Sequence, residues 1–169
     1  MHVCKYCVIV LFTVGFTKVT AQQNFDFAVG IGILELPHVA ARYQIKQVKI
    51  GLGVGAYKQR NIRELSSWAD VYYHFGGNSK HTDVRPWFAR GGFHYNFYES
   101  ESSIINETWI QVTMGREFNI TKRLGIAVDA GMAKRITFKE EFKKPIAGWN
   151  LFDFPEWPAV SFQLFYRLN

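Results

Sequence analysis

The charged residues that could carry chemistry stand at alternate positions within short, otherwise apolar segments. Ten of them would share the polar face of extended strands: Asp26, Arg42, Lys49, Asp70, His74, Arg90, His94, Glu117, Asp129 and Arg167. Four are acids, four are bases, and two are histidines that could transfer protons. Because buried charges need partners of opposite sign, we expect these residues to form a network of ion pairs and hydrogen bonds inside the fold.

Eight segments with a period of two follow one another from Asn24 to the end of the chain. The last, residues 159–169, keeps this alternation apart from Phe165, and the chain stops there. A final amphipathic strand is what a barrel needs in order to close against its first strand. We therefore predict an all-β fold, an eight-stranded antiparallel transmembrane up-and-down β-barrel, with the last strand beside residues 25–34 and Arg167 opposite Asp26.

The predicted connections differ in length between the two rims. Three links on one rim are short: residues 46–47, 76–83 and 119–122. The other rim has a brief link near residues 35–38 and three longer ones: residues 58–66, 98–106 and 134–158. Short turns on one rim and longer loops on the other are typical of outer-membrane barrels.

Polarity separates a membrane barrel from a secreted, lipocalin-like ligand-binding barrel, which would place its apolar face inward. The apolar faces are nearly free of charge, and a basic residue facing lipid at mid-bilayer costs about 2–4 kcal/mol. Arg116 falls in the outward phase, but near a strand end. Aromatic residues suited to the membrane interfaces gather towards strand ends: Phe25, Phe27, Tyr73, Phe75, Trp87, Tyr95, Phe97 and Tyr166. These features favour the membrane barrel.

The N-terminus has the pattern of a secretory signal peptide, which we predict over residues 1–21, with the barrel domain over 22–169. Residues 8–16 are apolar, and Val19-Thr20-Ala21 offers small residues for cleavage. Cys4 and Cys7 lie in this leader, so the mature chain has no cysteine. Loss of Lys5 and Lys18 lowers the net charge from +6 to +4. A mildly basic protein could favour anionic lipid head groups or polyanions; spare lysines in loops are the simpler explanation.

Several stretches resemble the small outer-membrane β-barrel proteins of the Bacteroidetes type, an outer membrane protein beta-barrel or porin-like family. They are residues 20–22, 29–34 (VGIGIL), 50–57 (IGLGVGAY), 85–97 (RPWFARGGFHYNF), 129–132 (DAGM) and 162–169 (FQLFYRLN). The resemblance implies an eight-stranded barrel in a Gram-negative outer membrane, often with no assigned activity. Many such barrels end on an aromatic residue, whereas this chain ends on Leu168-Asn169.

A lipid A-modifying enzyme of the outer membrane is the alternative function. Some eight-stranded barrels of this class use a histidine, a serine and an acid near the rim. Here no His-x-Ser pair occurs, and Ser161 stands alone among the lumen serines, so no base and nucleophile can be paired. We expect no catalytic residue. No spacing of Asp, Glu, His or Cys suggests a metal site, so we expect no metal and no cofactor.

The last predicted loop is the best candidate for binding a partner. It carries six aromatic residues: Phe138, Phe142, Trp149, Phe152, Phe154 and Trp157. Long loops on a rigid scaffold often bind partners. Alternatively, the strands extend beyond the bilayer and the aromatic residues fold over the barrel mouth.

The sequence therefore predicts a non-enzymatic outer-membrane protein with a packed polar lumen and a structural, adhesive or loop-mediated binding role. Its expected partners are outer-membrane lipids and, during insertion, the barrel-assembly machinery. We expect a monomer and no nucleic-acid binding, because the basic residues are scattered and no nucleic-acid motif is present.

Overall fold

The computed structural model describes residues 25–143 and 155–168, which form eight β-strands. The predicted signal peptide lies outside the described residues. In chain order the strands are β1 (Phe25–Gly32), β2 (Leu36–Ile45), β3 (Val48–Gln59), β4 (Ile62–Gly76), β5 (Trp87–Glu99), β6 (Ser103–Asn119), β7 (Leu124–Phe142) and β8 (Glu156–Leu168). In these two ranges no helix is long and apolar enough to span a membrane.

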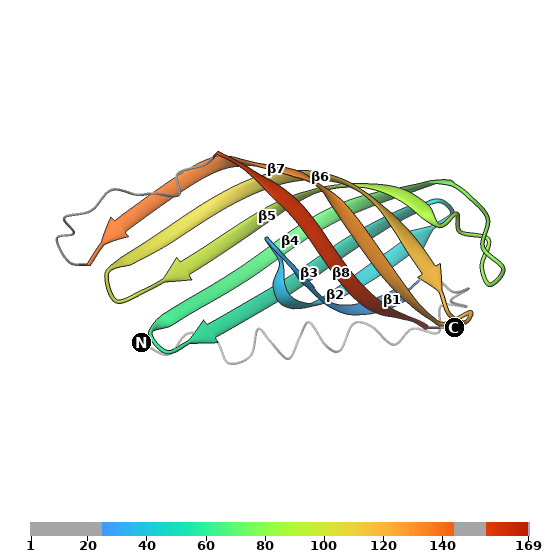
Figure 1. The fold of residues 1–169 in the computed structure, drawn as a ribbon, viewed down its shortest axis with the longest axis horizontal. Coiled ribbons are helices and arrows are strands. Elements are labelled where there is room, and N and C mark those ends of the chain that lie inside the picture. Colours follow the sequence, from blue (N-terminus) through green and yellow to red (C-terminus); the bar gives the residue numbers. More distant parts are fainter. Residues whose placement is uncertain (1–24, 144–154, 169) are drawn as a thin grey trace, which may run out of the picture.

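The strands close into a barrel in which every strand pairs with its neighbours in the sequence (Figure 1). β8 pairs antiparallel with β1, from Phe25 opposite Leu168 to Gly32 opposite Ser161. This register confirms the predicted eight-stranded antiparallel barrel and the position of the last strand beside the first. Closure leaves no unpaired sheet edge along the length shared by all eight strands.

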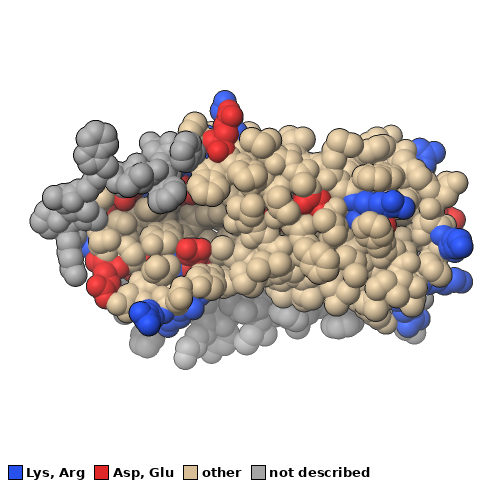
Figure 2. Space-filling view, in the orientation of Figure 1, with Lys and Arg blue, Asp and Glu red and all other residues tan. Residues whose placement is uncertain are grey.

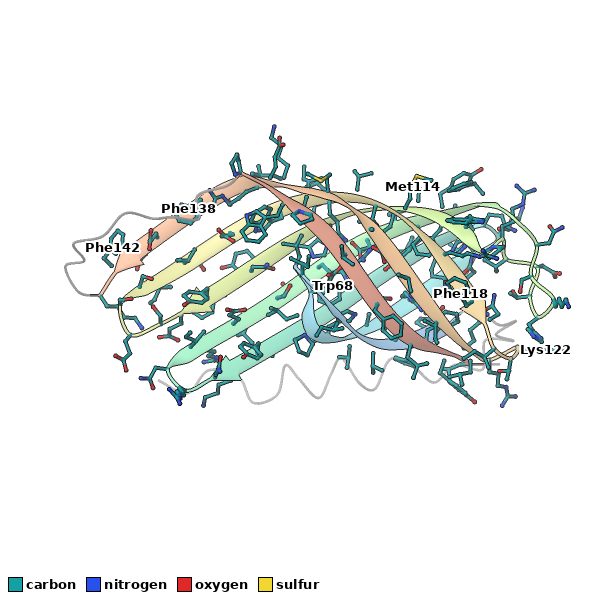
Figure 3. The ribbon with its side chains drawn as sticks, in the orientation of Figure 1. Trp68, Met114, Phe118, Lys122, Phe138 and Phe142 are labelled. Atoms are coloured by element: carbon teal, nitrogen blue, oxygen red, sulfur yellow. The ribbon has the colours of Figure 1, made fainter. Side chains whose placement is uncertain are left out.

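Polar and apolar residues occupy opposite sides of the wall, in the reverse of their arrangement in a water-soluble protein. Large apolar side chains face outward, and Val112 on β6 is 65% exposed. Charged side chains face inward, and Lys49 on β3 is 0% exposed. Figure 3 shows the contrast, with Trp68 directed into the barrel and Met114 directed away from it. Because successive side chains on a strand point to opposite faces, the alternation in the sequence produces this arrangement directly.

Part of the wall is taller than the rest. β3 to β7 continue beyond the ends of β2 and β8, and we call this extension the projecting sheet: residues 56–59, 62–65, 97–99, 103–106 and 135–142. Figure 1 shows it at the end of the barrel opposite the C-terminus. Residues 60–61 and 100–102 form its tight turns.

The predicted turn at residues 46–47 is confirmed, but the predicted lengths of the long loops on one rim and of the 76–83 link on the other are wrong. Most of residues 58–66 and 98–106 belong to strands, and β7 runs to Phe142. Conversely, residues 77–86 form a ten-residue link on the rim for which short turns were predicted. Charged and serine-rich segments suggested loops, but a strand with water on both faces does not need an apolar face.

Three residues assigned to the aromatic loop lie in strands. Phe138 and Phe142 belong to β7, and Trp157 belongs to β8. A register shift hides this from the sequence: Trp109 pairs with Arg135 and Thr108 with Thr137, so Ile136 is an extra residue that changes the phase of β7. Trp149, Phe152 and Phe154 lie outside the described residues.

Candidate functional site

All ten charged residues predicted for the lumen lie inside the barrel and are buried. They fall into two clusters. The rim cluster lies towards the end that carries the C-terminus and consists of Asp26, Arg42, Lys49, Glu117 and Arg167. The Arg90 cluster lies in the direction of the projecting sheet and consists of Glu35, Asp70, Arg90 and Asp129, with His94 against it. His74 contacts the rim cluster.

The rim cluster is held by two acids that each bind two bases. Lys49 Nζ lies 2.5 Å from Glu117 Oε1 and 3.0 Å from Asp26 Oδ2, so it joins the two acids. The second partner of Asp26 is Arg42, and the second partner of Glu117 is Arg167, whose Nη2 lies 2.6 Å from Glu117 Oε2. Three bases on two acids leave the cluster with a charge of +1 when His74 is neutral.

An aromatic ring helps to accommodate this excess positive charge. Phe165, the residue that breaks the alternation of β8, is buried at 1% exposure. Its ring lies 4.6 Å from the guanidinium carbon of Arg167, 5.1 Å from that of Arg42 and 5.5 Å from Lys49 Nζ. Cations are attracted to the face of an aromatic ring, and more strongly where water is excluded. Phe165 therefore belongs to the interior.

The predicted position of Arg167 opposite Asp26 is confirmed, but its ion pair is formed with Glu117. The two residues are opposite one another in the β1–β8 register, but Arg167 reaches Glu117 and also donates to Asn119 Oδ1 at 2.6 Å. Asp26 is already bonded to Arg42 and Lys49. The long side chain of Arg167 crosses the lumen to β6, where Glu117 and Asn119 offer acceptors. Its partner is therefore not determined by which residue lies opposite it on the neighbouring strand.

The Arg90 cluster gathers three carboxylates around one guanidinium. Arg90 Nη2 lies 2.6 Å from Asp70 Oδ2 and 2.8 Å from Glu35 Oε1, and Arg90 Nη1 lies 3.4 Å from Asp129 Oδ1. With His94 neutral, these four residues carry a charge of −2. The two clusters thus place opposite net charges at successive levels of the lumen.

Glu35 enters this cluster from the turn between β1 and β2, residues 33–35, which folds into the barrel. Leu34 is buried against Trp109, Ala133 and Ala159. Its carbonyl oxygen accepts a hydrogen bond of 3.3 Å from Asn96 Nδ2. We call residues 33–35 the inward turn, because its side chains close the lumen towards the projecting sheet.

Sequence reasoning missed the inward turn and treated Glu35 and His38 as loop residues. His38 instead lies on the inner face of β2, with its ring at 5.0 Å from that of Trp68. One feature of the sequence could have identified Glu35: it is the single acid within the otherwise apolar run of residues 31–37 (IGILELP). An acid at the tip of an apolar hairpin needs either water or a buried partner.

Gly55 on β3 permits the inward turn to approach the wall. A Cβ atom at this position would lie 1.8 Å from the carbonyl oxygen of Glu35. We expect Gly55→Val to displace the turn from the lumen and to destabilise the barrel by about 1–3 kcal/mol, as overpacking does. Channel recordings in planar bilayers would then show larger or more frequent conductance events than the wild type. The matched control is Gly91→Val, since the nearest backbone atom to a Cβ there is 4.0 Å away. Equal conductance in Gly55→Val and the wild type would contradict a closing role for the turn.

Rings and hydrogen bonds occupy the rest of the lumen around the two clusters. Trp68 stacks on His94 with centroids 5.7 Å apart, and Phe88 lies 5.5 Å from both Tyr72 and His74. His74 Nδ1 also lies 2.7 Å from the carbonyl oxygen of Arg85. Both histidines are buried among protein groups. Among residues 25–143 and 155–168, no three His, Cys, Asp or Glu side chains are arranged to hold a metal ion.

The inner face of the projecting sheet combines aromatic and acidic side chains. Phe138 is 40% exposed and Phe142 58% exposed, both on the end of β7 that Figure 3 labels. Arg135 connects this face to the lumen, with its guanidinium carbon 4.4 Å from the Phe138 ring centroid and its Nη1 2.9 Å from Glu107 Oε1. Burial raises the pKa of the Glu64 carboxyl on the neighbouring part of β4.

Together, the closed eight-stranded wall, the charged interior and the apolar exterior define a fold that resembles the small outer-membrane β-barrels. The N-terminal β-barrel domain of OprF from Pseudomonas aeruginosa is similar in structure, with a TM-score of 0.60 and 13% sequence identity over 87% of this chain and 98% of that domain. Neisserial surface protein A has a TM-score of 0.48 and 12% identity over 86% of this chain and 95% of its own. No family model and no curated protein matches the sequence.

Proposed function

We propose that the chain is an integral outer-membrane β-barrel without enzymatic activity, exported by a cleaved signal peptide at residues 1–21 and present as a monomer. The lumen serves as its polar core, and the projecting sheet binds a partner outside the cell. The observation that carries this proposal is the reversed polarity of the wall, with charges buried and large apolar side chains exposed. Outer-membrane barrels show this polarity, with apolar residues towards lipid.

The height of the apolar surface matches a bilayer. Trp87 begins the outward face of β5 and Phe97 ends its apolar part, before Glu99. The ten steps from Trp87 to Phe97, at about 3.4 Å each and tilted by about 40°, rise about 26 Å, close to the band of about 25 Å expected for this class. Figure 2 shows few charged atoms across the middle of the visible surface. The rim that holds the C-terminus then faces the periplasm, and the projecting sheet lies outside the cell.

The occupation of the lumen supports a structural role for its charges. The carboxylates of the two clusters already contact bases, and His74 and His94 are buried inside the wall at 0% and 1% exposure. A lipid substrate in the bilayer would have no direct access to either ring. For this reason we favour a scaffold over a lipid-modifying enzyme.

The projecting sheet supports the binding role, since it presents exposed aromatic residues on a rigid framework. Exposed apolar patches that are rimmed by polar residues commonly mark interaction sites. Its tip is also held in place: Lys143 Nζ donates a 2.7 Å hydrogen bond to Glu99 Oε1, which lowers the pKa of the Glu99 carboxyl.

Cell fractionation tests the membrane assignment. We expect the mature protein in the outer-membrane fraction, with an electrophoretic mobility that changes on boiling because the barrel resists detergent until heated. Recovery in the soluble fraction would contradict the proposal.

Adhesion of cells that express the protein tests the binding role of the projecting sheet. The double variant Phe138→Ser with Phe142→Ser should reduce attachment. The control variant Lys139→Ser with Glu141→Ser, on the opposite face of β7, should not.

A further inference from the structure

The rim that carries the C-terminus is strongly basic. Six exposed basic side chains surround it, and we call this set the basic rim: Lys46, Lys80, Arg85, Arg116, Lys122 and Arg123. Among the described residues of this rim, Asp83 is the only exposed acid, so the exposed groups carry a net charge of +5. Figure 2 shows lysine and arginine gathered at this end of the molecule, on the side where Figure 3 labels Phe118 and Lys122.

The opposite end shows that this charge is a local feature. The described residues of the projecting sheet and the strand ends beside it contain equal numbers of acids and bases. The acids are Glu64, Glu99, Glu101, Glu107, Glu140, Glu141 and Glu156, and the bases are Lys58, Arg60, Arg63, Lys134, Arg135, Lys139 and Lys143. The excess of positive charge on the exposed surface therefore belongs to the basic rim.

Arg116 places part of the basic rim at the boundary of the apolar surface. Its side chain is on the outward face of β6, directly after the apolar Met114. Its guanidinium carbon lies 5.3 Å from the ring centroid of Trp87 and 5.0 Å from that of Phe118. Aromatic rings of this kind mark the head-group level of a membrane, and a long basic side chain can lie along them with its charge towards water. Arg116 is thus positioned to meet lipid phosphates.

A hollow of about 410 Å³ on the lipid-facing side of β1 to β3 is apolar. A second hollow, of about 240 Å³ beside Arg116, is lined mainly by polar residues, together with Pro86 and Phe118. The donors of the second hollow include the side chains of Asn78, Lys80, His81 and Arg116. Glu117 also lines it, but this carboxylate is bonded to Lys49 and Arg167. Ammonium, amide and guanidinium groups together suit a phosphate, which the guanidinium can bind through two parallel hydrogen bonds.

We propose that the basic rim binds the phosphate head groups of anionic phospholipids in the periplasm-facing leaflet, with the hollow beside Arg116 as the principal position. This inference rests on the proposed membrane location. Lipid is favoured over a dissolved anion because the hollow is continuous with the aromatic residues that border the apolar surface, so one ligand can place its phosphate among the donors and its acyl chains along the wall.

Quenching of tryptophan fluorescence by brominated lipid tests the proposal. Among the tryptophans that the structure describes, Trp87 reports on the hollow, whereas Trp68 and Trp109 are buried in the lumen and Trp157 is at the other end. The mature protein is inserted into phosphatidylethanolamine bilayers that contain either dibromo-phosphatidylglycerol or dibromo-phosphatidylethanolamine. We expect quenching to indicate a several-fold preference for the anionic lipid, and Arg116→Gln to weaken that preference about fivefold, the usual effect of one base near a charged surface. Arg63→Gln, at the opposite end, should leave it unchanged.

The other outcomes each overturn the inference. Equal quenching by the two brominated lipids in the wild type would show that the rim has no preference for anionic lipid. A preference that inorganic phosphate abolishes would indicate a site for free phosphate. Failure of the wild type to insert, detected as a band whose mobility does not change on heating, would overturn the proposed function and this inference with it; insertion without a lipid preference would overturn this inference alone.

Discussion

Arg90→Met is expected to lower the free energy of unfolding by about 3–5 kcal/mol, the cost of breaking a buried ion pair by removing one partner. Methionine fills a similar volume but leaves Glu35, Asp70 and Asp129 inside the barrel without their shared cation. Urea titration of the protein in lipid vesicles, followed by tryptophan fluorescence, measures this change. The effect should be among the largest of any single substitution, because three carboxylates depend on one guanidinium.

Two further variants separate loss of charge from general disturbance. Arg63→Met makes the same substitution at an exposed arginine of β4, and it should change the free energy of unfolding by no more than about 0.5 kcal/mol. Asp70→Asn in the Arg90→Met background should recover part of the loss, since it removes one of the uncompensated charges. If Arg90→Met unfolds at the same urea concentration as the wild type, the proposed role of Arg90 as the centre of the polar core is wrong.

Glu117→Ala is expected to have an effect of similar size, about 3–5 kcal/mol. Its carboxylate is the acceptor for both Lys49 and Arg167, so its removal leaves two buried cations of which only Lys49 keeps an acid, Asp26. The same urea titration applies. Glu141→Ala, an exposed acid near the end of β7, is the matched control and should change stability by no more than about 0.5 kcal/mol.

The conservative substitution at the same position distinguishes charge from hydrogen bonding. Glu117→Gln keeps an acceptor for Arg167 but removes the negative charge. We therefore expect its free energy of unfolding to lie between those of the wild type and Glu117→Ala. A wild-type stability for Glu117→Ala would mean that Phe165 and Asp26 alone can accommodate the three bases of the rim cluster.

These two predictions share one physical basis. In a barrel surrounded by lipid, as we propose for this chain, apolar burial against the outside cannot hold the interior together, because the outer side chains meet hydrocarbon and the inner ones are polar. Stability then depends on each buried charge having its partner, in a region where unpaired charge is costly. The aromatic residues Phe165 and Tyr72 contribute by lying against guanidinium groups in both clusters.

The inward turn and the projecting sheet divide the tasks at the outer end of the barrel. Leu34 and Glu35 close the lumen at the short side of the wall, while the long strands on the other side carry exposed aromatic residues beyond the ends of β2 and β8. Under the proposed function, a partner at these aromatic residues binds without opening the lumen. The conductance of Gly55→Val and the adhesion of the Phe138 and Phe142 variant examine these two tasks independently.

The alternation of residues determined much of the structure by itself. A period of two makes successive side chains face opposite sides of a strand, so the sequence alone identified eight strands, their antiparallel order and the ten charged residues of the interior. It also placed Arg116 on the outer face near a strand end, where the structure has it. These are local properties, and each depends only on residues close together in the chain.

Only the tertiary structure decided which charges meet. Arg167 binds Glu117 rather than its register neighbour Asp26, and Arg90 gathers acids from three other strands or turns. Such partners depend on the tilt and curvature of the closed sheet and on the reach of long side chains across the lumen, none of which a period encodes. The hollow at the basic rim also depends on tertiary structure: Lys80 and Arg116 are distant in sequence, and the position of the 77–86 link beside β6 brings them to one surface.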